Sequence, residues 1–98
     1  MLISPKILYK NCYGKYAIPA VNVFTMEQII ALFRSGEKAD APFMVQITPA
    51  ARDYANSNIL LSIIEEASKL YPKATYFVHL DHGNEIHAFD AIKSNKYN

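Results

Sequence analysis

The residues best suited to chemistry in this chain stand at the end of one apolar run. Tyr76–Leu80 is aromatic and β-branched, as in a strand interior, and Asp81, His82 and Gly83 follow it directly. In a parallel α/β sheet or barrel, sites are built at the carboxyl ends of the strands. A carboxylate beside an imidazole at such an end favours a metal site with an adjacent base. Gly83 allows the backbone to turn sharply there.

Two other predicted strands also end in polar side chains. Residues 17–23 predict a strand that is weakened at Pro19, which cannot donate to the ladder, and Asn22 stands near its end. Residues 43–48 predict a second strand that ends in Thr48. Parallel strands bring such ends to one edge of a sheet, although they are far apart in sequence. We therefore expect an amide, a hydroxyl, a carboxyl and an imidazole to converge on one rim.

The segments between the strands carry helix signals. We expect Gly36 to close the second helix and Asn95 to take a left-handed conformation after the last one. Pro49 should end the second strand, and a polar loop should lead to the third helix. The predicted helices cover residues 4–12, 25–36, 56–70 and 84–92. Units of about 30 residues predict an α/β fold with parallel strands and right-handed crossovers.

Composition narrows the function classes. The chain has 98 residues, 51% hydrophobic residues and a net charge of +1, which suit one small domain and argue against a nucleic-acid partner. Cys12 is the single cysteine and cannot form an internal disulfide, which fits a reducing compartment. The N-terminus lacks a signal-peptide layout, and no run approaches the ~20 apolar residues of a membrane span. We expect a cytoplasmic protein without a membrane partner.

The segment His79-Leu80-Asp81-His82-Gly83 resembles the H-x-D-H-G signature of class II, zinc-dependent ketose-bisphosphate aldolases. Residues 19–23 resemble the first barrel strand of that family, and residues 45–48 resemble its second. The resemblance extends over nearly all of the chain but covers only the first part of the family's usual length. It implies a TIM (β/α)₈ barrel, of which residues 1–98 would be a single incomplete domain.

The resemblance also implies roles for four residues. His82 would bind zinc, and Asp81 would act as general acid/base at the oxygen of the cleaved bond. Asn22 and Thr48 would contact substrate, Thr48 at the position of a family serine near a phosphate. The chain departs from the family by having Pro49-Ala50-Ala51 in place of a glycine-containing loop. His79 would hydrogen-bond near the site rather than bind the metal.

The implied reaction is reversible cleavage of fructose 1,6-bisphosphate to dihydroxyacetone phosphate and glyceraldehyde 3-phosphate. Zinc would act as a Lewis acid, with a monovalent cation as a candidate activator. The other two zinc histidines of the family lie on later strands. The expected partner is a phosphorylated ketose, and we expect a homodimer or higher oligomer for a full-length chain.

Several other interpretations stay open. Each candidate has an ordinary structural reading: a surface histidine, a helix-capping aspartate, a turn asparagine and a strand-ending threonine. His87 is expected to be exposed on the last helix. At the level of function, the alternatives are a tagatose-bisphosphate aldolase, a zinc hydrolase on a similar barrel, or a non-catalytic fragment. The 98 residues alone are expected to be inactive, because three βα units cannot close an eight-stranded barrel.

Overall fold

The computed structural model describes all 98 residues and contains one parallel sheet of three strands. The strands are β1 (Ala20–Asn22), β2 (Phe43–Ile47) and β3 (Tyr76–Leu80), in the spatial order β1-β2-β3. Val45 of the central strand is in register with Val21 on one side and Val78 on the other. This arrangement confirms the predicted α/β fold with parallel strands, and an additional helix precedes the first strand.

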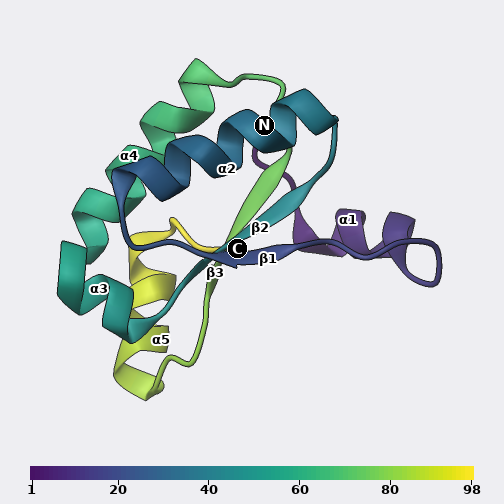
Figure 1. Ribbon diagram of the computed structural model, residues 1–98. Coiled ribbons are helices and arrows are strands. Elements are labelled where there is room, and N and C mark those ends of the chain that lie inside the picture. The colour runs from purple at the N-terminus through teal and green to yellow at the C-terminus, as the bar shows by residue number, and fades with distance from the viewer.

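Five helices accompany this sheet (Figure 1): α1 (Pro5–Cys12), α2 (Met26–Ala39), α3 (Pro49–Ala55), α4 (Ser57–Leu70) and α5 (Glu85–Ser94). The helices α2 and α4 pack against each other on one side of the sheet, and α1 stands apart from them. Tyr9 of α1 meets Phe77 edge to face, with ring centroids 5.8 Å apart, so α1 contacts the side chain that β3 turns away from the main core.

The core lies between the sheet and the α2–α4 layer. Phe33 of α2 packs edge to face on Phe43 and Tyr76, with centroid distances of 5.1 and 4.6 Å. Phe43, Val45 and Ile47 alternate with half-buried residues along β2, which is the period of a strand with one buried face. Full burial of such side chains contributes roughly 1.5–3 kcal/mol each. This packing fixes the strands and therefore the rim where they end.

Most predicted helix ends are confirmed. Thr25 starts α2 with a capping box, and Asn84 starts α5 with another, in which the Asn84 N–H donates to His87 Nδ1 at 3.1 Å. His87 is therefore half-buried rather than exposed. Asn56 caps α4, and Asn95 takes the left-handed conformation after α5, with φ of 55°. No helix in the chain has the length and apolar character that a membrane span requires.

The prediction that Gly36 closes the second helix is wrong. The helix continues to Ala39, and Asp40 takes the left-handed conformation with φ of 50°. Position 36 lies inside the helix and is a glycine because the Phe43 ring packs directly against it. A Cβ at this position would stand 2.3 Å from Phe43 Cε1. The glycine is thus explained by a close long-range contact and not by a helix end.

Two boundaries around the other strands also differ from the prediction. The first strand covers three residues and not residues 17–23, because Pro19 has no N–H for the ladder and the residues before it lie outside the pairing. The polar loop expected after Pro49 is a helix, α3, in which Pro49 occupies the first turn. A proline without an N–H ends a strand and is equally suited to start a helix.

Candidate active site

The carboxyl ends of the three strands meet at one edge of the sheet. Asn22 is in register with Gln46, and Gln46 is in register with His79. Thr48 and Asp81 follow directly after the last residues of β2 and β3, so both stand at this edge. The structure therefore places the four candidate residues on one rim. The hydrogen-bond partners and the solvent exposure of these side chains differ from one strand to the next.

Asp81 is held across the sheet. Its backbone N–H donates to the Ile47 carbonyl at 3.0 Å, and its Oδ2 accepts a hydrogen bond from Gln46 Nε2 at 2.7 Å. Its side chain is 24% exposed, which leaves part of the carboxyl accessible at the rim. A carboxyl with one oxygen fixed by an amide and with solvent access suits proton transfer to a bound molecule.

Gln46 is a site residue that the sequence reasoning missed. It lies inside an otherwise apolar strand, on the face opposite the buried Val45 and Ile47. A polar residue inside an apolar strand, on the face opposite the buried side chains, was the available signal. Nothing in the local pattern could reveal its partner, because Asp81 is 35 residues further along the chain.

The two histidines beside Asp81 differ in exposure. His82 Nε2 lies 3.6 Å from Asp81 Oδ2, and its side chain is 83% exposed. His79 Nε2 lies 3.9 Å from Asp81 Oδ1, and its side chain is 45% exposed. Both distances exceed the length of a hydrogen bond, so the contacts are electrostatic and depend on protonation of the imidazoles. His82 is the imidazole that projects furthest into solvent at the rim.

The sharp turn after β3 is made by His82 itself. Its φ is 54°, in the left-handed region that non-glycine residues adopt rarely. The sequence favoured Gly83 as the turning residue, but Gly83 has a different reason. A Cβ there would stand 2.6 Å from Leu80 Cδ2 and 3.2 Å from the Cβ of His87. Gly83 therefore lets the turn fold closely over the end of β3, which directs the backbone at His82 away from the strand.

Thr48 and Asn22 have different surroundings. Thr48 Oγ1 accepts a hydrogen bond from the Ala51 N–H at 3.2 Å and so caps α3. Because the oxygen is the acceptor there, the hydroxyl proton remains available to a ligand oxygen. Asn22 is exposed at the end of β1, which is an edge strand of the sheet. The Asn22 side-chain amide forms no hydrogen bond within the chain, so it is not needed to stabilise the fold.

The chain alone does not assemble a metal centre. No group of three His, Cys, Asp or Glu side chains is placed to hold a metal ion. A catalytic zinc site needs three protein ligands and an open position. The exposed imidazole of His82 fits one of these positions, with Asp81 beside it as a neighbouring carboxylate. The residues present therefore fit a part of a zinc site and not a complete one.

Parallel strands that end in polar side chains at one edge of a sheet are typical of α/β enzyme folds, and comparison with known proteins gives the family. The family model described as class-II fructose-bisphosphate aldolase matches residues 4–98. The chain belongs to the class II fructose-bisphosphate aldolase family. This finding confirms the resemblance that the His79–Gly83 segment indicated, and family members are aldolases.

Individual relatives agree with this assignment. The chain is 40% identical over 81 residues to a fructose-bisphosphate aldolase of Nostoc sp. (strain PCC 7120), covering 82% of the chain and 23% of the relative. It is 33% identical to the fructose-bisphosphate aldolase of Treponema pallidum, covering 95% of the chain and 30% of the relative. The chain thus spans less than a third of the length of these relatives.

A solved structure supports the fold. The crystal structure of the YdjI aldolase from Escherichia coli K12 matches the whole chain with a TM-score of 0.85 and 19% sequence identity. The chain covers 38% of that structure. The three βα units and the N-terminal helix therefore have the arrangement found in one part of a larger aldolase, which confirms the prediction that the chain forms part of a TIM barrel.

Proposed function

We propose that the protein carrying this chain catalyses the zinc-dependent, reversible cleavage of fructose 1,6-bisphosphate to dihydroxyacetone phosphate and glyceraldehyde 3-phosphate. The observation that carries the proposal is the pairing of Gln46 with Asp81 beside the exposed His82, within a segment of this aldolase family. A fixed carboxyl next to a metal-binding imidazole is what proton transfer at a polarised carbonyl compound requires.

The chain's own residues have separate roles in this proposal. Asp81 exchanges a proton with the oxygen at the cleaved carbon–carbon bond, and Gln46 holds the carboxyl in place. Thr48 donates its hydroxyl proton to an oxygen of the substrate, and Asn22 contributes its amide from the neighbouring strand. His82 is one ligand of zinc, which when bound supplies Lewis-acid polarisation of the ketose carbonyl.

The full-length protein would complete the barrel that this chain begins. Residues 1–98 would form the N-terminal part of a single domain, and the missing zinc ligands would come from later strands. A full-length homodimer or higher oligomer in the cytoplasm, with a monovalent cation as activator, belongs to the same proposal. A tagatose 1,6-bisphosphate aldolase is the second candidate, because the same polar residues at the edge of the sheet suit cleavage of either sugar.

The test is a product assay on the full-length protein with zinc present. We expect triose phosphates from fructose 1,6-bisphosphate and no release of inorganic phosphate. Phosphate release without triose phosphate would replace the aldolase with a hydrolase. The 98-residue chain, assayed in parallel, should show no turnover, and turnover by it would show that the ligand set is complete within these residues. Tagatose 1,6-bisphosphate is compared as substrate in the same assay.

A further inference from the structure

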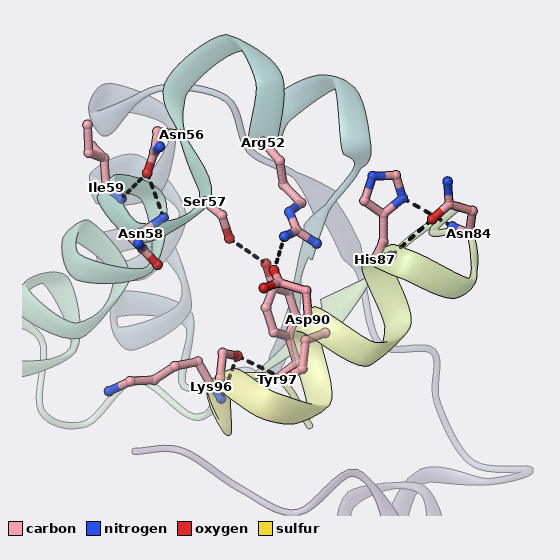
Figure 2. Close-up of polar contacts among 12 residues, drawn as sticks. Arg52, Asn56, Ser57, Asn58, Ile59, Asn84, His87, Asp90, Lys96 and Tyr97 are labelled. Atoms are coloured by element: carbon pink, nitrogen blue, oxygen red, sulfur yellow. Dashed lines mark hydrogen bonds and ion pairs between the residues drawn. The ribbon is translucent and has the colours of Figure 1, made fainter.

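Arg52 connects the corner after β2 with the helix that follows the corner after β3. It lies in α3, and its backbone N–H donates to the Thr48 carbonyl at 3.1 Å. Its side chain extends to α5, where Nη2 forms a hydrogen-bonded ion pair with Asp90 Oδ2 (Figure 2). The N-cap of α5 is Asn84, two residues after His82. The ion pair therefore joins the two corners that carry candidate site residues.

The Arg52 side chain is 12% exposed, whereas that of Asp90 is 58% exposed. Arg52 Nη1 is buried and has no hydrogen-bond partner within the chain. A largely buried guanidinium is unfavourable unless a carboxylate compensates its charge. Asp90 is the carboxylate that does so, and this dependence restricts where α3 can stand relative to α5.

The short α3 needs such an attachment. It has seven residues, fewer than an isolated helix requires for stability in water. Ala51 anchors it to the core with 1% exposure, and Arg52 attaches it to α5. A second contact joins the same part of the chain to the segment after α5: Ser57 Oγ, at the start of α4, lies 3.3 Å from the Tyr97 hydroxyl.

Both connected helices begin at the rim. The Thr48 hydroxyl caps α3 through the Ala51 N–H, and α5 starts with the Asn84–His87 capping box just after the turn at His82. A shift of α3 relative to α5 therefore changes the separation between the Thr48 hydroxyl and the corner formed by Asp81 and His82.

We propose that Arg52 is a positioning residue whose pair with Asp90 sets the place of the Thr48 hydroxyl opposite the Asp81–His82 corner. In this way it determines the affinity for a phosphorylated ketose without touching it. The inference rests on the proposed function, because it assigns Thr48 to substrate contact. Displacement of a substrate-binding group raises KM more than it lowers kcat when the proton-transferring group stays in place.

The experiment uses steady-state kinetics of the full-length protein with fructose 1,6-bisphosphate. Arg52→Met and Asp90→Asn should each raise KM by about tenfold and change kcat by less than about threefold. Zinc content should be unchanged, and Asp90→Glu, which keeps the carboxylate, should restore KM. The matched control is Glu66→Gln, which removes a carboxylate from the exposed Lys69–Glu66 pair of α4.

The outcomes separate the two claims. An unmodified protein that releases no triose phosphate overturns the proposed function and, with it, this inference. An active protein whose KM is unchanged in both variants overturns the inference alone. A loss of thermal stability or kcat at unchanged KM does the same, because it shows a purely structural pair. If Asp90→Asn fails to fold, Arg52→Met decides the question, since it leaves only an exposed carboxylate.

Discussion

The corners after β2 and β3 occupy equivalent places in the sheet but use their polar side chains differently. After β2, the Thr48 oxygen is engaged locally, where it caps the helix that starts at the next residue. After β3, the Asp81 carboxyl is engaged across the sheet by Gln46, and His82 extends into solvent in a left-handed conformation. One corner mainly maintains the fold, and the other presents reactive groups.

This difference allows one edge of the sheet to be stable and still present ionisable side chains to solvent. At the β2 corner, the hydrogen bond that stabilises the helix also fixes the hydroxyl for a ligand. At the β3 corner, fixing Asp81 requires a residue of another strand, and the exposed His82 contributes nothing to the hydrophobic core. Substitutions at the β3 corner should therefore affect the proton transfer and metal binding, whereas those at the β2 corner should affect stability and KM.

The largest effect is expected from His82→Ala in the full-length protein. Zinc affinity and turnover should each fall by at least about 100-fold, because one of three ligands is lost. Folding should be retained, since the side chain is exposed. Zinc per protomer and triose-phosphate release are the measurements. His87→Gln is the control, because glutamine can replace histidine in the α5 capping box. Unchanged zinc content in His82→Ala would remove His82 from the metal site.

Gln46→Ala should give the next largest effect. Without the amide, the Asp81 carboxyl loses its 2.7 Å partner and becomes mobile, so kcat should fall about tenfold. KM and zinc content should stay near their original values. Gln28→Ala provides the comparison: it removes an amide from the α2 capping box and should lower stability without changing kcat. Equal kcat in Gln46→Ala and the unmodified protein would contradict the positioning of Asp81.

Thr48→Ala tests the β2 corner. The lost N-cap should lower the free energy of unfolding by about 1 kcal/mol, measured by urea denaturation. Thr48→Ser keeps the hydroxyl and should behave like the original residue in both stability and KM. If the serine variant is as unstable as the alanine variant, the methyl group and not the cap accounts for the stability of this corner.

The smallest effect is expected outside the rim, at Glu65. The hydrogen bond from Lys96, together with its charge, lowers the pKa of this carboxyl below its ordinary value of 4.5. Its contribution to stability is therefore present above about pH 4.5 and is lost as the pH falls through the folded-state pKa. Glu65→Gln should remove this part of the acid dependence, measured as the unfolding midpoint between neutral and acidic pH. The exposure of the ion pair to solvent keeps the effect small.

Local sequence patterns were sufficient for much of the fold. Alternating and apolar runs predicted the three parallel strands, and Thr25, Asn84 and Asn95 predicted helix ends that the structure has. These signals depend on neighbours a few residues apart, so they can be read without a structure. The same holds for the position of Asp81 and His82 at the end of a strand.

The errors come from contacts that are distant in sequence or from residues with two uses. Gly36 accommodates the Phe43 ring and does not end a helix. Pro49 marks the end of a strand and is also the first residue of α3, so the strand signal alone did not predict the helix. The Gln46–Asp81 hydrogen bond depends on strand register, which no local pattern contains. The contacts between the candidate site residues can therefore be described only once the packing of the sheet is known.

In the proposed function, Asp81 transfers a proton beside a metal ion that it does not itself bind. The most direct measurement compares turnover and zinc content of Asp81→Ala with those of the unmodified full-length protein. Triose-phosphate release should fall by at least about 100-fold while zinc per protomer stays constant. A parallel loss of zinc and turnover would contradict the claim and make Asp81 a residue that supports the metal.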